Sequence, residues 1–491
     1  MFESAEIGHK LGKTEFKRAE PRLRKRLLDL QHQLLVQAKY PVIILVNGVD
    51  GAGKGETVNL LNEWMDPRHI HTHAFGALTD VERARPEMWR FWQVLPPKGK
   101  VGILFGSWYT DPIIQRVMGR EKRPRFEERL MRIRQFERML VAEGALLLKL
   151  WFHLSKKAQK KRLRELSSKK ETAWRVTREE WDNFEHYDDF IDVSEDALRE
   201  TSTGEASWDV IEGSDHQYRS LTAGRLLESA LAARLKGERP VLSPPAPSPA
   251  PPLDGRTLLA SFDYKRKLER DQYEKKLSRL QARLAILTRS KRMRERSLVM
   301  VFEGMDAAGK GSTIRRVTQA LDARFYRVIP VAAPTQEERA QPYLWRFWRH
   351  IPGHGKAAIF DRSWYGRVLV ERVEKFCSEF DWMRAYNEIN EFEEELVESG
   401  AVVAKFWMAV TPAEQLKRFK ARQNIAYKRF KITAEDWRNR KKWPAYEQAV
   451  NDMIDRTSSD RAPWQVIASD DKLFARIQTL ERLCERIEEA I

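Results

Sequence analysis

Short apolar runs alternate with longer amphipathic segments along the second half of the chain. The apolar runs predict strands at 298–302, 327–331, 357–360, 402–408 and 464–468. The amphipathic segments predict helices near 310–321, 382–398, 412–422 and 472–489. This alternation favours an α/β fold, in which a parallel sheet is covered by helices on both faces. Ligands of such sheets bind at the carboxyl ends of the strands, so the residues that follow each strand are the candidates for function.

A glycine-rich segment follows the first of these strands. Residues 304–313 read Gly-Met-Asp-Ala-Ala-Gly-Lys-Gly-Ser-Thr and stand between an apolar run and a predicted helix. Such a turn directs backbone N–H groups and one lysine at a chain of phosphates. A glycine-rich turn without a ligand is the alternative, but the flanking strand and helix favour a phosphate site. The predicted phosphate-binding residues are Gly309, Lys310, Gly311, Ser312 and Thr313.

The same motif occurs earlier in the chain, in residues 48–57 after the apolar run 42–46. Its first glycine lies 256 residues before Gly304 (304 − 48 = 256), and further matches keep this spacing without a gap. They include Trp89 with Trp345, Trp208 with Trp464, and the Ser-Trp-Tyr motif at 107–109 with that at 363–365. Solenoid repeats are only about 20–50 residues long, so the sequence predicts a tandem duplication of a whole domain.

The composition supports two domains. A chain of 491 residues has room for two cores, and residues 240–252 are rich in proline, as in a semi-rigid linker. We expect an N-terminal domain at 1–238, a linker at 239–256 and a C-terminal domain at 257–491.

The net charge of +17 and the pI near 9.7 predict attraction to polyanions. Solvated basic helix faces would also explain the charge, but the phosphate-binding loops favour a phosphate polymer or a nucleotide. The sequence has no basic stripe with regularly spaced stacking aromatics, so no nucleic acid partner is expected.

Two cysteines, the lack of a membrane-spanning apolar run and the lack of a secretory signal predict a cytoplasmic protein with no membrane partner.

Two carboxylates are candidates for holding a metal ion. Asp361 and Arg362 follow the apolar run 357–360, where phosphate-loop enzymes keep a magnesium-binding acid. Asp306 lies within the loop itself. A lone aspartate after a strand is more often a helix cap, but the Asp-Arg pair beside a phosphate loop favours Mg²⁺ bound by Asp306 and Asp361.

A cluster of cations follows the predicted helix 412–422. In nucleotide kinases the comparable region is a lid that closes over the phosphates, whereas the alternative is an exposed basic hairpin. Its cations are Lys428, Arg429, Lys431, Arg438, Arg440, Lys441 and Lys442, with Phe430, Trp437 and Trp443 among them.

Six motifs together resemble the polyphosphate kinase type 2 family. They lie at 304–311, 334–338, 343–346, 360–365, 368–373 and 462–464, and the resemblance extends from about residue 264 to the C-terminus and more weakly over 20–235. It implies a duplicated kinase fold with a phosphate loop and a helical lid, magnesium dependence, and phosphoryl transfer between inorganic polyphosphate and a nucleotide. The tandem form resembles the two-domain subgroup, the polyphosphate:AMP phosphotransferases, which make ADP from AMP.

The resemblance and the chemistry of phosphoryl transfer assign roles in the second half. Lys310 would hold the terminal phosphates, Asp306 and Asp361 the metal, and Arg362 and Arg440 would neutralise the transferred group. Lys428 and Lys431 would bind phosphate. The AMP pocket is expected among Thr335, Glu338, Trp345, Arg346 and Arg367, although Trp345 is equally consistent with plain core.

The two halves differ at the positions that carry the chemistry. At the constant spacing Asp361 becomes Phe105, Arg362 becomes Gly106 and Arg440 becomes Phe184. The first half keeps Asp50 and Lys54, but phenylalanine cannot bind magnesium. We therefore expect a catalytically weak or inactive first half that supports the second. The second half also departs from the common phosphate-loop motif, because Gly311 stands where a serine or threonine usually binds magnesium.

Three alternatives stay open at this stage. An ATP-dependent nucleoside monophosphate kinase would share the loop and lid, and polyphosphate could instead phosphorylate a nucleoside diphosphate. A nucleic-acid-binding ATPase would explain the charge. The sequence also leaves a homo-oligomer open.

Overall fold

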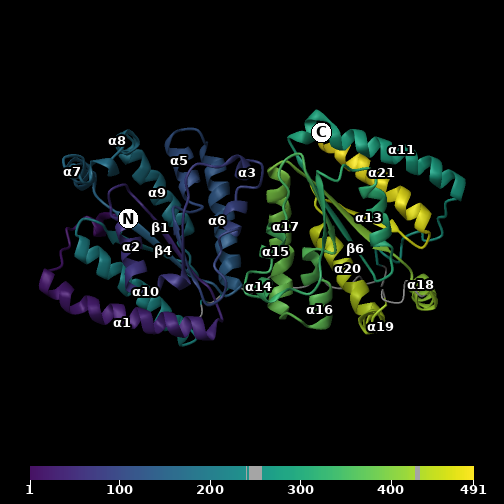
Figure 1. Ribbon diagram of the computed structural model, residues 1–491, viewed down its shortest axis with the longest axis horizontal. Helices are drawn as coiled ribbons and strands as arrows, with labels where there is room; N and C mark the ends of the chain where they lie inside the picture. The colour runs from purple at the N-terminus through teal and green to yellow at the C-terminus, as the bar shows by residue number, and fades with distance from the viewer. Residues whose placement is uncertain (239, 241, 243–256, 426–431) are drawn as a thin grey trace. The chain divides into compact units, whose positions relative to one another are not determined.

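The computed structural model describes residues 1–238, 240, 242, 257–425 and 432–491 (Figure 1). They form two compact units. The first contains the described residues of Met1–Ala77, Arg90–Ser243 and Thr335–Trp345. The second contains those of Leu78–Trp89, Pro244–Pro334 and Arg346–Ile491. Almost all of the linker expected at 239–256 lies outside the described residues, so the predicted domain limits remain a prediction.

The first unit is built on a parallel sheet with the strand order β2-β3-β1-β4-β5. Its strands are β1 (Val42–Gly48), β2 (Ile70–Ala74), β3 (Val101–Phe105), β4 (Leu146–His153) and β5 (Trp208–Glu212). Its longer helices are α1 (Lys13–Gln37), α2 (Lys54–Trp64), α6 (Arg123–Ala142), α7 (Lys156–Ser167), α9 (Tyr187–Thr201) and α10 (His216–Leu235). Shorter helices are η1 (Glu3–Ala5), η2 (Pro67–His69), α4 (Trp89–Trp92), α5 (Thr110–Val117), η3 (Ala173–Arg175) and α8 (Arg178–Glu185).

The second unit repeats this sheet as β10-β9-β6-β8-β7, which is the same order read from the other edge. Its strands are β6 (Ser297–Gly304), β7 (Tyr326–Pro330), β8 (Ala357–Asp361), β9 (Ala401–Ala409) and β10 (Trp464–Ala468). Its longer helices are α11 (Arg270–Arg289), α13 (Lys310–Thr318), α17 (Glu379–Glu398), α18 (Pro412–Asn424), α19 (Ala434–Lys441), α20 (Trp443–Thr457) and α21 (Lys472–Ala490). Shorter ones are α3 (Asp80–Arg83), α12 (Lys291–Arg294), α15 (Trp345–Trp348), η4 (Trp364–Arg367) and α16 (Val370–Glu374), whereas α14 (Gln336–Arg339) belongs to the first unit.

The predicted α/β fold and its tandem duplication are thus confirmed. The five strands predicted in the second half all form, within a few residues of their expected ends. The helix expected at 310–321 ends at Thr318, and the one expected from 382 begins earlier, at Glu379. The central strands β6 and β9 are buried along almost their whole length, which explains why they read as uninterrupted apolar runs.

The pairing of the central strands places the functional loops beside each other. In the second unit β6 pairs with β8, and Phe302 stands opposite Asp361. The glycine-rich loop therefore begins next to the residue that ends β8. The strand order also reverses here, since the chain leaves β6 for one side of the sheet and later returns to the other, and this is where α/β folds bind ligands.

A buried ionic network holds the segment that follows β8. Lys405 of β9 and Glu393 of α17 are both buried, and Lys405 Nζ donates to Glu393 Oε2 at 2.7 Å. Trp364 Nε1 and Tyr365 OH both donate to Glu393 Oε1, at 3.0 and 2.7 Å. The first unit repeats the arrangement with Lys149, Glu137, Trp108 and Tyr109. The repeated Ser-Trp-Tyr motif is therefore explained by packing in both units.

Helices cover the sheets with apolar faces. In the second unit α11 and α21 pack against each other (Figure 1), and their leucines join residues of β6 and β9 in one core. In the first unit α1 and α10 pack in the same way against β1 and β4.

Candidate active site

The loop after β6 of the second unit, where the sequence predicts a phosphate site, forms an open cradle. Gly309 precedes α13 with a φ of 114°, in the left-handed region that glycine adopts freely. Lys310 Nζ folds over the loop and donates to the carbonyl oxygen of Gly304 at 2.6 Å. Among the described residues, a methyl group placed on Gly309 would meet only Ser312 Oγ, at 3.7 Å. The first turn of α13 is thus accessible to a ligand.

The predicted phosphate residues of α13 lie in different environments. Gly311 is exposed and has open space around it. Ser312 is half-buried and donates through Oγ to the Gly309 carbonyl oxygen at 2.9 Å. Thr313 is buried, and its Oγ1 donates to the same carbonyl oxygen at 3.3 Å. Ser312 is therefore better placed than Thr313 to meet a phosphate.

Asp306 and Arg362 are brought together across the cradle. Arg362 Nη2 donates to Asp306 Oδ1 at 3.0 Å, and Asn439 Nδ2 donates to Asp306 Oδ2 at 3.0 Å. Burial lowers the pKa of Lys310, and so does Arg362, while Asp306, Asp361 and Glu303 act in the opposite direction. The charge of the loop lysine is therefore coupled to the guanidinium and to all three carboxylates.

Glu303 is a site residue that the sequence reasoning missed. It lies in β6 immediately before Gly304, is buried, and accepts from Ser363 Oγ at 2.8 Å. Burial raises the pKa of Glu303, opposed by Lys310, the Ser363 hydrogen bond and Arg362. Two features of the sequence could have identified it. Glu303 is a charged residue at the end of an otherwise apolar strand, and its counterpart in the first unit is the neutral Asn47.

Arg362 adopts a backbone conformation that is costly for its residue type. Its φ is 65°, and the counterpart Gly106 has nearly the same φ of 74°. A non-glycine residue in this region costs about 1–3 kcal/mol, and such residues cluster at functional sites. Nearby Asp306, Glu303 and Asp361 raise the pKa of Arg362 although burial opposes them. The second unit thus keeps a guanidinium where the first has the unstrained glycine.

The described part of the predicted lid is fastened to the loop. Arg440 of α19 donates through Nη1 to the carbonyl oxygen of Pro412 at 2.8 Å and to Gln415 Oε1 at 2.9 Å. Gln415 in turn donates through Nε2 to the backbone oxygen of Asp306 at 3.0 Å. Asn439, also in α19, reaches the Asp306 carboxylate. Lys428, Arg429, Phe430 and Lys431, which the lid hypothesis includes, lie outside the described residues.

These groups enclose a small cavity of about 70 Å³. Its polar walls come from the strand end, the loop and the lid, and its apolar walls come from aromatic residues. The polar residues are Glu303, Asp306, Arg362, Gln415, Asn439 and Arg440, and the aromatic ones are Trp407, Trp443 and Tyr446.

The residues predicted to bind a nucleotide do not gather around this cavity. Thr335 and Glu338 form the capping box of α14, and Trp345 is buried at the start of α15. Arg346 donates through Nη2 to the Ala332 carbonyl oxygen at 3.0 Å, and Arg367 pairs with Glu371 at 2.8 Å. Among the described residues, none of these five predicted residues lines the 70 Å³ cavity, and their nucleotide role stays a prediction.

The corresponding loop of the first unit is occupied by the protein's own charges. Glu56, at the position of Ser312, pairs with Arg219 at 2.7 Å, with Arg162 at 3.1 Å and with Arg175 at 3.3 Å. Burial opposes ionisation, yet Arg219 and Arg162 lower the pKa of Glu56. A methyl group on Gly53 would lie 2.1 Å from Arg219 Cζ, so this guanidinium covers the loop. A phosphate chain therefore meets a filled cradle.

The α/β fold and the glycine-rich loop at the carboxyl end of β6 are those expected of a phosphotransferase. The family model described as Polyphosphate kinase 2 matches residues 10–239 and 267–491, so the chain belongs to that family. In the part of the chain that the structure describes, no helix has both the length and the apolar character needed to cross a bilayer.

Relatives match all or nearly all of the chain. A polyphosphate:AMP phosphotransferase of Pseudomonas aeruginosa is 53% identical over 491 residues, which cover 100% of this chain and 99% of that protein. One of Acinetobacter johnsonii is 37% identical over 453 residues, covering 91% and 90%. A crystal structure described as a putative polyphosphate kinase 2 of Pseudomonas aeruginosa superposes with a TM-score of 0.90 at 51% identity, covering 100% and 99% of the two chains.

Proposed function

We propose that this protein transfers the terminal phosphoryl group of inorganic polyphosphate to AMP, giving ADP, and that the second unit carries the reaction. The bond between the terminal phosphorus and its bridging oxygen breaks as an oxygen of the AMP phosphate bonds to that phosphorus. The relatives that match all or nearly all of the chain are named for this reaction. The second unit is supported as the site of the reaction by the carboxylates and cations around Lys310, because Asn47, Phe105 and Gly106 of the first unit replace Glu303, Asp361 and Arg362.

Phosphoryl transfer has a loose transition state that needs alignment and charge stabilisation rather than a covalent intermediate. Lys310 and the backbone N–H groups of the cradle would hold the terminal phosphates in line with the acceptor. Arg362 extends from its strained position toward the same cradle, where it would neutralise charge on the transferred group. Arg440 and Asn439 would close the lid over the reacting atoms and exclude water.

The carboxylates fit a divalent cation, which we propose to be Mg²⁺. Asp306 already accepts from Arg362 and Asn439, but each carboxylate oxygen has a second lone pair for a metal. Among the described residues no group of three or more His, Cys, Asp or Glu side chains could hold a metal by itself. Mg²⁺ commonly takes one or two carboxylates and completes its coordination with substrate phosphates and water. When bound by Asp306 and Asp361, it would offset the negative charge of the phosphates.

The test is a donor and acceptor matrix. Purified protein with magnesium is given AMP or ADP, and either polyphosphate or ATP. We expect rapid formation of ADP from AMP and polyphosphate, much slower formation of ATP from ADP, and loss of turnover after chelation with recovery when magnesium is restored. Rapid phosphorylation of AMP by ATP without polyphosphate would instead support the monophosphate kinase alternative. A cytoplasmic location and a homo-oligomer stay expectations from the sequence.

A further inference from the structure

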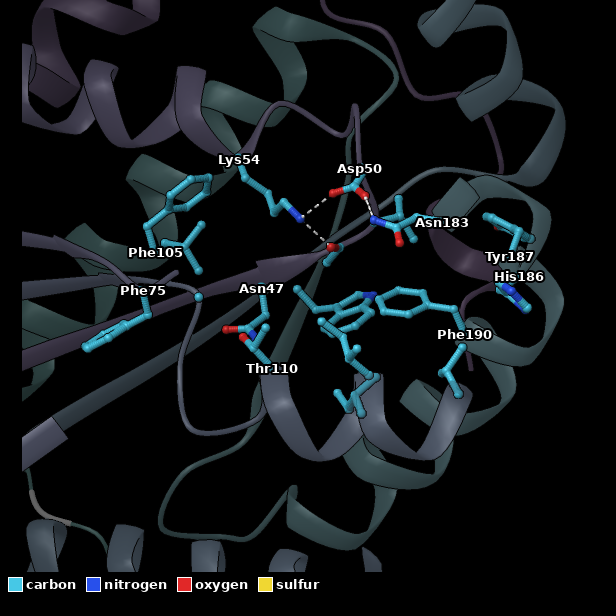
Figure 2. Close-up of a pocket in the computed structure, with 18 of the residues that line it drawn as sticks. Asn47, Asp50, Lys54, Phe75, Phe105, Thr110, Asn183, His186, Tyr187 and Phe190 are labelled. Atoms are coloured by element: carbon cyan, nitrogen blue, oxygen red, sulfur yellow. Dashed lines mark hydrogen bonds and ion pairs between the residues drawn. The ribbon is translucent and has the colours of Figure 1, made fainter. Parts of the chain in front are cut away.

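The first unit contains a cavity of about 430 Å³, whereas the corresponding cavity of the second unit measures about 70 Å³. It lies at the carboxyl ends of β1, β3 and β4, and residues of α5, α8 and α9 close it (Figure 2). A volume of this order is typical of small-molecule sites, which are mostly apolar with a few placed polar groups. The reaction proposed for the second unit gives this cavity no role.

Uncharged residues have replaced three charged ones of the active site around this cavity. Its wall includes Phe75 and Phe105 on one side and Tyr187 and Phe190 on the other (Figure 2). Asn47, Phe105 and Gly106 stand where the second unit has Glu303, Asp361 and Arg362. The replacement removes two carboxylates and one guanidinium and leaves flat aromatic surfaces in a neutral environment.

The charges that remain are paired within the protein. Lys54 Nζ lies 3.3 Å from Asp50 Oδ1 and donates to the Gly48 carbonyl oxygen at 2.6 Å. Asn183 donates through Nδ2 to the other oxygen of Asp50 at 3.3 Å (Figure 2). The cradle beyond them is filled by Glu56 and Arg219. An anionic ligand would have to compete with these contacts, whereas an uncharged one would leave them intact.

Two residues that line the cavity each carry a buried polar atom that has no partner among the described residues. These atoms are Trp151 Nε1, in a side chain that is 1% exposed, and Gln159 Oε1, in one that is 3% exposed. The oxygen of Gln159 is unpaired for a specific reason. Its counterpart Gln415 accepts from Arg440, and the residue at the position of Arg440 in the first unit is Phe184.

A buried polar group without a partner costs about 1–3 kcal/mol, which a ligand that supplies the partner would recover. The indole nitrogen of Trp407 is likewise unpaired in the second unit, so that donor is common to both cavities. The unpaired acceptor of Gln159 occurs only in the cavity of the first unit, among the described residues of the two cavities. A ligand would therefore meet one donor, one acceptor and several aromatic faces.

We propose that this cavity binds an uncharged heteroaromatic molecule of nucleoside size, at a site separate from phosphoryl transfer. Flat rings stack on the aromatic walls, and the polar edge of a heterocycle pairs with Trp151 Nε1 and Gln159 Oε1. Adenosine is a suitable probe because it has such an edge and no charge. AMP is the matched comparison because it differs only by its phosphate.

The experiment is calorimetric titration of the full chain with adenosine, in the natural protein and in two matched variants. Ile114→Trp fills the cavity from α5, and Val370→Trp makes the equivalent change at the active-site cavity. We expect Ile114→Trp to weaken adenosine binding at least tenfold while turnover of AMP with polyphosphate stays normal. Val370→Trp should abolish turnover and leave adenosine binding unchanged.

Two further measurements test the chemistry of the ligand. Gln159→Leu, which keeps the volume and removes the acceptor, should weaken adenosine binding severalfold. In the Val370→Trp variant, AMP should bind at least tenfold more weakly than adenosine, and polyphosphate should not compete. The proposal is overturned if adenosine does not bind the natural protein, if Ile114→Trp leaves its affinity unchanged, or if AMP or polyphosphate binds the first unit more tightly. Binding is measured without turnover, so failure of the proposed reaction would not alter these results.

Discussion

Replacing Lys310 by alanine tests the assignment of the reaction to the second unit. Lys310 Nζ lies over the open cradle, 2.6 Å from the Gly304 carbonyl oxygen, and its charge is coupled to Arg362 and three carboxylates. The variant removes the cation that would follow the transferring phosphoryl group. Loss of one such stabilising group commonly costs a hundredfold or more in rate, which corresponds to about 2.7 kcal/mol of transition-state stabilisation. We expect a loss of at least this size.

Lys54→Ala is the matched control within the same chain. Lys54 Nζ donates to the Gly48 carbonyl oxygen at the same distance, 2.6 Å, so both variants lose an equivalent hydrogen bond to the loop, worth about 1 kcal/mol of stability. Lys54 differs in its surroundings, because Glu56 and Arg219 fill its cradle and Phe105 stands at the position of Asp361. Lys54→Ala should therefore keep turnover within about threefold of the natural protein.

The assay is steady-state kinetics with AMP and polyphosphate on both variants. Circular dichroism and a thermal melt would confirm that each remains folded. Large and equal losses in the two variants would refute the reasoning, since the first unit would then be catalytic with its metal held by Asp50 and an acid that we have not identified. A small loss in Lys310→Ala alone would refute the role of the cradle in the second unit.

Three further variants test individual groups. Asp361→Asn should keep the fold and lose about a hundredfold in turnover, because an amide is a poor magnesium ligand; near-normal rates across a magnesium titration would exclude Asp361 as a ligand. Glu303→Gln should lower kcat at least tenfold. The stability of this variant relative to the natural protein should also increase as the pH rises. Burial raises the pKa of Glu303 in the folded state, so the unfolded chain loses the Glu303 proton at a lower pH than the folded protein does. The natural protein therefore loses stability above the pKa of the unfolded chain, and Glu303→Gln does not. Thermal melts of this variant and the natural protein at several pH values would show the difference, and a constant difference would contradict it. Lys405→Met should destabilise the protein by about 3–5 kcal/mol in denaturant unfolding, because it leaves Glu393 buried without its cation, and an unchanged midpoint would show that the network is dispensable.

The buried networks also explain which parts of the duplication have been kept. The Ser-Trp-Tyr motif survives in both units although the neighbouring Asp-Arg pair survives in only one. Trp364 and Tyr365 bond to Glu393, and Trp108 and Tyr109 bond to Glu137 in the same way. Loss of either glutamate would leave a buried lysine unpaired, so the motif is retained for folding. Replacing the Asp-Arg pair leaves no buried lysine unpaired, and this pair has been replaced in the first unit.

The strained backbone of Arg362 gives independent support to this division. The turn after β8 requires a positive φ in both units, at Arg362 and at Gly106. Glycine satisfies that requirement without strain, so stability alone would favour it at both positions. An arginine held there in the second unit fits the role proposed for its guanidinium beside Asp306, to which it donates at 3.0 Å.

The amino-acid sequence by itself determined the strands, the glycine-rich loops and the duplication. The strands and loops depend on local order, because apolar periodicity and the flanks of a loop can be read within a window of about 20 residues. The duplication follows from comparing the chain with itself at a constant spacing. The loss of Asp361 and Arg362 from the first half could also be read directly, as Phe105 and Gly106 at constant spacing.

Only the tertiary structure decided which groups meet. Asn439 reaches Asp306 from 133 positions away, and Arg219 pairs with Glu56 from 163 positions away. The buried Glu303, the filled cradle of the first unit and the large cavity beside it likewise depend on how α8, α9, α10 and α19 pack against the strand ends. No local pattern carries that information, because long-range packing fixes the contacts between side chains that lie far apart in the chain.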